Sequence, residues 1–496
     1  MPSINNVADI FHDPYTSLGV RPFINCCGTR TVHGGSLILP EVRVAMGLAS
    51  LQFVNMNELM ERARIRIAEL TGAEDGIVTA GSAAAIAIAT AAAIAGNDPV
   101  RMLRLPKSTG TTNQVVMLNT HRFPYDQAIR MVGAQITEVD HVNQLTQLNF
   151  KKVAMIVYLG ARDKNSAISL ETFVAAGRHN GIPVLVDAAS EHISRPNPWL
   201  IRGADLVVYS GGKALRGPQT SGLLLGRRDL IDSAWANSPP HRAFGRPMKF
   251  GKEDVVGILA ALELWFSRDP SIAMQSWIQD LETIVNIAKA TPSIETEIIP
   301  PEEGDQTPQI RINWDYNKLK FHGTELRRQL LAGTPRILID DITAGPGTVT
   351  IDIFSLHNGE AKTVADAIVA ILNSTPVPQT PSAQAEIITG KWVIDVHFPR
   401  FVRTHKSNFH QTGTAILGKQ RSPGFATPIN GTVNGIKAEF SFEGTYEGAI
   451  ITYHFTGLIQ GNYMSGEVIF GSTTTQTRGV VSYNQYGKAQ WDARRL

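Results

Sequence analysis

Features of secreted and membrane-spanning proteins are scarce in this sequence. Among its 496 residues there are only two cysteines, Cys26 and Cys27. Adjacent cysteines rarely meet disulfide geometry, so we expect a reducing compartment. Residues 1–15 lack the basic segment and apolar core of a signal peptide. The most apolar run, 83–95, is much shorter than the about 20 residues of a membrane span. We therefore expect a cytoplasmic protein with no membrane partner.

The net charge of the chain is also low. The chain carries 46 basic and 44 acidic residues, which leaves a formal charge of +2. Nucleic-acid binding depends on basic surface, so we expect no nucleic-acid partner. A content of 43% hydrophobic and 18% charged residues is typical of a soluble globular protein. The length predicts two or three domains.

Changes of pattern along the chain predict where the domains lie. In residues 51–251 short apolar runs alternate with helical segments, which predicts a mainly parallel sheet covered on both faces. Residues 252–373 predict a smaller α+β domain, joined by an N-terminal arm, 1–50. A proline-rich linker follows at 374–387. Short strands without helices in 388–496 predict an antiparallel barrel or sandwich.

The individual elements expected from periodicity and turn signals can be stated by range. Helices are predicted at 57–70, 83–95, 255–265, 277–288 and 362–372. Strands are predicted at 77–78, 115–117, 135–139, 153–157, 184–186, 206–209, 310–314, 349–353, 392–398, 409–417, 436–442, 450–455 and 467–470. Two Gly/Asn pairs, at 434–435 and 461–462, predict hairpin turns.

The segment 183–226 carries the residues most suggestive of chemistry. One predicted strand delivers Asp187 at its carboxyl end, and the next delivers Ser210, two glycines and Lys213. In open α/β sheets, ligands bind at the carboxyl ends of the strands. Pyridoxal phosphate (PLP) requires a carboxylate that keeps its pyridine nitrogen protonated and a lysine that forms a Schiff base. The alternative is a turn-forming aspartate beside a solvated lysine.

A second segment could hold the phosphate of such a cofactor. A predicted strand is followed by Gly81, Ser82 and Ala83 at the start of a long helix. Free backbone N–H groups and the positive end of the helix dipole favour an anion there. The alternative is ordinary helix capping, which uses the same residue types.

His121 follows another predicted strand, between the phosphate segment and the aspartate. An aromatic or imidazole ring stacked on the pyridine ring is expected in this region. The alternative is a histidine that packs or caps. Three further histidines, His397, His405 and His410, lack convincing metal-ligand spacing, so we expect no metal site.

Three motifs in order resemble the selenocysteine synthase-like group of PLP enzymes, which includes L-seryl-tRNA selenium transferase and the D-glucosaminate-6-phosphate ammonia-lyase type. They are INCCGTRTVHGGS at 24–36, SGGKALRGPQTSG at 210–222 and GRPMKFGKED at 245–254. The resemblance covers about residues 15–373. The C-terminal region resembles small calycin-like β-barrels more weakly, on 466–470 and 491–495.

The resemblance implies a fold-type I PLP enzyme, a homodimer or higher homo-oligomer with active sites at the interface. It gives Lys213 the Schiff-base role and Asp187 the pyridinium role. The implied cofactor contacts are Gly81, Ser82, Ala83, His121, Ala189, Ser210 and Gly212. The implied substrate-side residues are Asn25, Thr29, Gln219, Arg246 and Lys249, although the last two could be solvated charges.

The same resemblance indicates the type of substrate and reaction. The selenium transferases carry an additional N-terminal tRNA-handling domain, whereas here the family pattern starts within the first twenty-five residues, so a small amino-acid substrate is expected. We predict a PLP-dependent lyase that removes the Cα proton and eliminates a β-substituent to give a keto acid and ammonia. Racemisation, aldol cleavage and β-replacement pass through the same carbanion and stay open. So does a PLP-bearing scaffold whose β-domain binds a ligand or partner.

Overall fold

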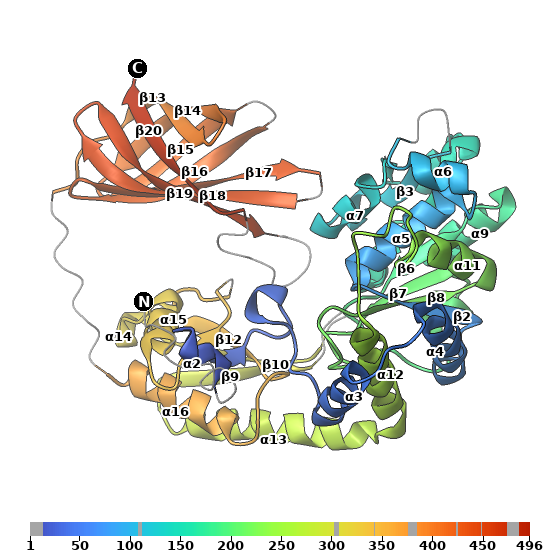
Figure 1. Cartoon of the computed structure of the whole chain (residues 1–496). Coiled ribbons are helices and arrows are strands. Elements are labelled where there is room, and N and C mark those ends of the chain that lie inside the picture. The colour runs from blue at the N-terminus through green and yellow to red at the C-terminus, as the bar shows by residue number, and fades with distance from the viewer. Residues whose placement is uncertain are drawn as a thin grey trace. The chain divides into compact units, whose positions relative to one another are not determined.

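The computed structural model of the chain describes residues 13–107, 112–301, 307–341, 343–374, 384–422, 425–447, 449–473 and 486–496. Two compact units are present (Figure 1): residues 1–121 with 125–375, and residues 376–496 with 122–124. Most of the predicted linker, and the first twelve residues used in the signal-peptide argument, lie outside the described residues.

A seven-stranded sheet in the first unit has the order β2-β8-β7-β6-β5-β3-β4. Its strands are β2 (Asp75–Thr79), β3 (Gln114–Leu118), β4 (Gln135–Val139), β5 (Val153–Leu159), β6 (Val184–Asp187), β7 (Leu206–Ser210) and β8 (Gly222–Gly226). All run parallel except β8, which is antiparallel to both neighbours. Successive residues of β5, β6 and β8 are all buried, so both faces of the sheet are covered.

Helices connect and cover these strands (Figure 1). They are α3 (Pro40–Ser50), α4 (Met56–Thr71), α5 (Ser82–Ala95), α6 (Pro99–Arg104), α7 (Gln127–Arg130), α8 (Val142–Leu145), α9 (Leu170–Asn180), α10 (Pro198–Ile201), α11 (Arg228–Asn237) and α12 (Lys252–Ser267). The short α2 (Pro14–Ser17) belongs to the N-terminal arm and lies away from this sheet (Figure 1). Helix α5 is almost entirely alanine and isoleucine and is buried all round, which fits a helix enclosed by the unit. No helix in the described ranges has both the length and the hydropathy that crossing a membrane requires.

A smaller α+β part follows in the same unit. An antiparallel sheet of order β12-β10-β9 contains β9 (Ile294–Ile299), β10 (Gln309–Trp314) and β12 (Thr348–Asp352). The helices are α13 (Pro270–Lys289), α14 (Tyr316–Leu319), α15 (Gly323–Ala332) and α16 (Glu360–Leu372), and α13, α15 and α16 contribute to one apolar core with the sheet. The N-terminal β1 (Ile24–Cys26) pairs in parallel with β11 (Ile337–Ile339). The exact boundaries of the large and small domains stay predictions.

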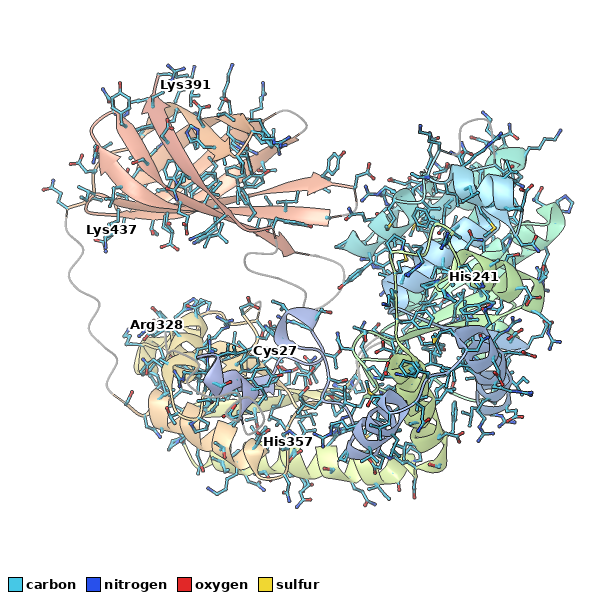
Figure 2. All side chains as sticks on the ribbon, in the orientation of Figure 1. Cys27, His241, Arg328, His357, Lys391 and Lys437 are labelled. Atoms are coloured by element: carbon cyan, nitrogen blue, oxygen red, sulfur yellow. The ribbon has the colours of Figure 1, made fainter. Side chains whose placement is uncertain are left out.

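The second unit is a closed eight-stranded antiparallel barrel. Its strands are β13 (Gly390–Phe398), β14 (Phe401–Thr412), β15 (Ala415–Ser422), β16 (Phe425–Asn434), β17 (Lys437–Tyr446), β18 (Ala449–Gln460), β19 (Tyr463–Thr473) and β20 (Lys488–Arg495). Buried and exposed residues alternate along β17, as a barrel wall requires. Lys391 and Lys437 lie on its outside (Figure 2). The predicted architecture, a mainly parallel α/β sheet with a smaller α+β part plus an antiparallel β-barrel, is confirmed.

Details of the barrel differ from the sequence expectation. The single strand predicted at 409–417 is wrong, because Gly413 adopts φ +60° and turns the chain between β14 and β15. Strands β16 and β20 were not predicted. Both predicted hairpin turns are confirmed. Gly435 and Gly461 have φ values of +59° and +63°, and each lies between two paired strands.

Candidate functional site

The carboxyl ends of three parallel strands bring the predicted cofactor residues to one edge of the large sheet. Asp187 is the last residue of β6, and β7 beside it ends at Ser210, three residues before Lys213. Strand β2 runs in the same direction, with β8 between it and β7, and leads into Gly81, Ser82 and Ala83. Residues separated by more than 130 positions in the sequence therefore meet at one edge.

Asp187 and Lys213 influence each other electrostatically. Asp187 is 5% exposed, and its Oδ1 accepts a hydrogen bond of 2.9 Å from the backbone N–H of Ala189. Burial raises the pKa of the Asp187 carboxyl, while the Ala189 N–H and the charge of Lys213 counteract the rise. Burial lowers the pKa of the Lys213 amine, and Asp187 counteracts that shift. Among the residues that the structure describes, none forms a hydrogen bond or ion pair with the Lys213 side chain.

The amino end of α5 is suited to an anion. Gly81 precedes the helix with φ +89°, no side chain caps the first turn, and a Cβ added to Gly81 would meet no atom within 4 Å. Gly222 of β8 lies against this turn, because its added Cβ would be 2.5 Å from the Gly81 carbonyl carbon and 2.8 Å from the Ser82 nitrogen. A larger residue at 222 would therefore displace the loop. These features fit a bound phosphate group.

The loop that carries Lys213 is held by the other two sequence motifs. Ser36 Oγ donates a 2.9 Å hydrogen bond to the carbonyl of Gly212. Thr220 Oγ1 donates a 2.6 Å hydrogen bond to Asp254 at the start of α12. The backbone N–H of Leu39 donates to the carbonyl of Arg216 at 3.1 Å. The three motifs, widely separated in sequence, thus form one structural unit around the lysine.

We call residues 24–39 the strap, because they link this loop to the smaller part of the unit. At one end β1 pairs with β11. Nearby, the Arg30 guanidinium pairs with Asp340 at 2.8 Å and with Asp341 at 3.2 Å, and all three side chains are at most 14% exposed. These ion pairs join the strap to the residues that follow β11. Breaking such a pair is costly because the remaining charge has already lost its solvent.

Replacing Arg30 by methionine should therefore destabilise the unit. The change keeps much of the apolar stem but removes the cation that pairs with both Asp340 and Asp341. Removing one partner of a buried ion pair costs about 3–5 kcal/mol. We expect calorimetry to give a lower thermal midpoint for the first unit. Arg328→Met is the matched control, because the exposed Arg328–Glu325 pair (Figure 2) contributes about 0–1 kcal/mol. Equal midpoints for the two variants would contradict the structural role of Arg30.

Asn25 and Thr29, predicted on the substrate side, lie within the strap. The Asn25 side chain accepts from the N–H of Cys27 at 3.0 Å and donates to the carbonyl of Gly28 at 2.8 Å, so its amide stabilises the local turn. Thr29 is half-buried. A substrate contact for either residue stays a prediction.

The two adjacent cysteines belong to the same region. Cys27 follows β1 (Figure 2), and both thiols are buried. Burial raises the pKa of each thiol, which keeps the sulfur protonated and unreactive as a nucleophile. His33, whose pKa burial lowers to about 4, is half-buried, and its ring edge meets Phe23. These residues have packing roles in this geometry.

His121 is enclosed rather than presented to a ligand. Its side chain is 0% exposed, Nε2 lies 2.7 Å from Ser166 Oγ, and Nδ1 accepts from the Leu159 N–H at 3.1 Å. The ring also packs edge-on against Tyr158. Burial lowers the pKa of His121 to about 4, so it is neutral. This geometry favours the packing interpretation over the predicted stacking role, because no face of the ring is open to a cofactor.

Tyr125 was not among the predicted site residues, although it lies four positions after His121. The residue is 54% exposed, but enough protein surrounds its hydroxyl that burial raises the pKa of the phenol, and the charge of Asp187 raises it further. Tyr125 is therefore a partly exposed aromatic residue whose phenol interacts with the charge of Asp187. The sequence assigned to His121 the role of a ring stacked on the pyridine, and Tyr125 has the properties that this role requires. The sequence signal was an aromatic residue in the same loop.

The remaining predicted substrate residues lie in two different settings. Gln219 is in the lysine loop, where Nε2 donates to Thr31 Oγ1 at 3.4 Å and Oε1 is buried without a hydrogen-bond partner in the described chain. Added Cβ atoms on Gly35 and Gly212 would both collide with this side chain. Arg246 and Lys249 are exposed on the segment between α11 and α12. That Arg246 and Lys249 contact the substrate stays a prediction.

Among the described residues, no three His, Cys, Asp or Glu side chains form a cluster able to hold a metal ion. His397 pairs with Asp492 on the barrel surface, and His405 is in the barrel interior. These positions match the surface and core roles expected for them.

Comparisons with known proteins add to this geometry. D-Glucosaminate-6-phosphate ammonia lyase of Salmonella typhimurium is 32% identical over 357 residues, which are 70% of this chain and 94% of that protein. A solved structure of D-glucosaminate-6-phosphate ammonia-lyase matches with a TM-score of 0.66 and 30% identity, covering 74% of this chain and 99% of that one. No protein-family model matches the sequence.

Two further relatives are named for other reactions. The 5'-C-glycyluridine monooxygenase-decarboxylase of a Streptomyces species is 31% identical over 364 residues, 71% of this chain and 90% of that protein. The L-seryl-tRNA(Sec) selenium transferase of Moorella thermoacetica is 25% identical over 295 residues, 51% of this chain and 57% of that protein. Similarity at this level therefore extends over more than one type of reaction.

Proposed function

The chain belongs to the family of D-glucosaminate-6-phosphate ammonia lyase, and from this we propose that it is a PLP-dependent lyase acting on an amino acid. The reaction is removal of the Cα proton and elimination of a β-substituent, after which water hydrolyses the released enamine to a keto acid and ammonia. The single observation that carries the proposal is the electrostatically coupled pair of Asp187 and Lys213 at the ends of adjacent parallel strands.

The site residues suit the cofactor in position and in protonation. Bound PLP supplies a protonated pyridine ring that withdraws electrons from the substrate Cα. The negative charge of Asp187, within a buried setting, holds the proton on the ring nitrogen. Lys213, whose lowered pKa favours the neutral amine, attaches to the cofactor and later takes the Cα proton at Nζ.

Other groups of the chain are candidates to bind the phosphate of PLP and to stack on its pyridine ring. The N–H groups at the start of α5 and the hydroxyl of Ser82 bind the phosphate, with Ser210 at the end of β7 nearby. Tyr125 is our candidate for the ring stacked on the pyridine, in place of His121. Gln219, Arg246 and Lys249 remain the candidates for substrate contacts, the two cations for a carboxylate or phosphate.

The test is product analysis with the PLP-loaded protein. We expect ammonia and a keto acid to form together from β-hydroxy amino acids or 2-amino sugar acids. Bound PLP with neither product from any of these substrates would contradict the lyase proposal. Exchange of the Cα hydrogen with deuterated water without product would indicate a racemase, and an aldehyde with glycine would indicate an aldolase.

We also propose that the chain forms a homodimer, on the basis of an exposed apolar surface. Val44, Leu48 and Leu51 are exposed at spacings of four and three residues, so they share one face of α3, and Phe53 is fully exposed just beyond. Exposed apolar residues gathered in this way mark interaction surfaces. A second copy of the chain is the partner that the fold-type I resemblance implies.

The double variant Leu48→Asp, Phe53→Asp should therefore be monomeric. Two charges in an apolar interface would be buried without partners, which strongly disfavours association. Sedimentation velocity should give a slower-moving species than the unmodified protein at the same concentration. Leu103→Asp, a single exposed leucine on α6, is the control that should leave the assembly unchanged. A double variant that sediments as the unmodified protein would exclude this surface as the interface.

A further inference from the structure

Three arginine side chains gather where the lysine loop meets the strap, α3 and α12. Arg216 lies in the loop, three residues after Lys213, and its Nε donates a 3.0 Å hydrogen bond to the carbonyl of Leu37 in the strap. Arg43 lies in the first half of α3, and Arg268 directly follows α12. The two helices pack side by side (Figure 1). We call Arg43, Arg216 and Arg268 the arginine cluster.

Hydrogen bonds and one ion pair bring the three segments together. The Leu39 N–H donates to the Arg216 carbonyl at 3.1 Å, and the Arg43 N–H donates to the Leu39 carbonyl at 3.0 Å. On α3, the Glu41 carboxylate pairs with Arg268 at 3.5 Å. Burial lowers the pKa of the Arg216 guanidinium, and the charges of Arg268 and Arg43 lower it further. Arg216 is therefore close enough to both other cations to be repelled by them.

Positive charge is in excess in the arginine cluster. Its three cations face one carboxylate, that of Glu41, which leaves a surplus of two positive charges. Arg268 already pairs with this carboxylate. In the part of the chain that the structure describes, neither Arg43 nor Arg216 forms an ion pair. Guanidinium groups gathered in this way repel one another unless an anion joins them, so the cluster is suited to bind an anion.

The backbone of Arg216 indicates that its side chain is needed. The φ of this residue is +52°, in the left-handed region that favours glycine. A loop that required only the turn would therefore carry glycine here. Within the described residues, the Arg216 side chain has one hydrogen-bond partner, the Leu37 carbonyl at Nε. Its two Nη atoms, which are both donors, thus remain available to a ligand.

The arginine cluster is distinct from the proposed cofactor site. The pKa of the Lys213 amine responds to burial and to the charge of Asp187, and to none of the three arginines. Likewise, Lys213 is the cation that affects the pKa of Asp187. An anion bound by the cluster is therefore not the phosphate that the start of α5 is proposed to bind.

We propose that the arginine cluster binds one phosphate group, free in solution or carried by a small metabolite. Planar guanidinium groups donate paired hydrogen bonds to phosphate oxygens. A phosphate group carries about two negative charges near neutral pH, which balance the surplus of positive charge. The ligand joins α3, α12 and the loop that contains Lys213, so bound phosphate holds this loop against both helices.

The test is calorimetric titration of the full-length protein, loaded with PLP, with inorganic phosphate at constant ionic strength. We expect Arg216→Gly to weaken phosphate binding at least about tenfold, because it removes charge-assisted hydrogen bonds. Glycine suits the φ at this position, so the variant should keep its fold. Arg43→Ala should weaken binding in the same way. Arg62→Ala, which changes an exposed arginine on α4, is the matched control that should leave binding unchanged.

A second probe identifies the source of the phosphate group. Tighter binding of glycerol 3-phosphate than of inorganic phosphate, with both weakened in Arg216→Gly, would indicate a phosphorylated metabolite. The reverse order would indicate free phosphate. All variants are compared under one condition, so the outcome does not require that the chain binds PLP or acts as a lyase.

Two results would overturn the proposal. The first is an absence of phosphate binding to the unmodified protein. If Arg43→Ala is then also monomeric in sedimentation velocity, a carboxylate of a second copy neutralises the cluster, which borders the proposed dimer surface at Val44. The second is equal binding by the unmodified protein, Arg216→Gly and Arg43→Ala. Loss of binding in Arg246→Ala instead would place the phosphate on the substrate side.

Discussion

Lys213→Ala should lower the rate of product formation by at least about a thousandfold, because one substitution removes both the covalent attachment and the base. The lysine lies in a loop that hydrogen bonds of Ser36 and Thr220 hold near the carboxyl ends of β6 and β7. Burial lowers the pKa of the Lys213 amine, which favours the neutral form that acts as nucleophile and proton acceptor. The measurement is single-turnover product formation with PLP in excess.

A covalent readout separates this role from a structural one. Borohydride reduction of the PLP-loaded protein should attach the cofactor to the peptide that contains residue 213, and mass spectrometry should find no such adduct in Lys213→Ala. Lys289→Ala, an exposed lysine at the end of α13, is the control that should retain both activity and adduct. An adduct on another lysine of the unmodified protein would require the assignment of Lys213 to be withdrawn.

Asp187→Asn should lower turnover by about 10²- to 10⁴-fold, the range expected for loss of a group that governs proton position. Asparagine keeps an oxygen that can accept the Ala189 N–H but lacks the charge that holds a proton on the ring nitrogen. Steady-state kinetics at saturating PLP measure the turnover.

The same substitution should not lower the thermal stability of the cofactor-free protein. Burial raises the pKa of Asp187 in the folded protein above its unfolded value. The folded state is thus favoured at acidic pH, and this contribution is lost as the pH rises through the folded-state pKa. At neutral pH Asp187→Asn should therefore not lower the thermal midpoint of the cofactor-free protein. Asp140→Asn, which follows β4 at the same sheet edge, should keep full activity. A midpoint lowered together with activity would indicate a structural role for Asp187.

Much of the architecture was predictable because the signals were local. The strand at 135–139 was predicted with its observed limits, and the strands that deliver Asp187 and Ser210 were predicted to within one residue at each end. Their apolar runs read as buried strands, since both faces of a parallel sheet are covered. Gly81 and Ser82 were identified by the strand–glycine–helix pattern, and the structure has that arrangement.

Other features depended on contacts between distant segments. Strand β8 is a short leucine run whose place between β2 and β7 follows from pairing, with Gly222 allowing close approach to Gly81. The pairing of β1 with β11 joins positions 24 and 337. His121 resembled a site residue in the sequence, but its enclosure by Ser166, Leu159 and Tyr158 is decided by packing.

The amino-acid sequence by itself determined the types of element, the order of the three motifs and the two groups, Lys213 and Asp187, that a PLP enzyme needs, because these follow from local periodicity and residue chemistry. Only the tertiary structure decided which strands lie side by side, how the strap holds the lysine loop, and that His121 is enclosed by packing. Burial and hydrogen bonding depend on neighbours that are remote in sequence, and local patterns carry no record of them.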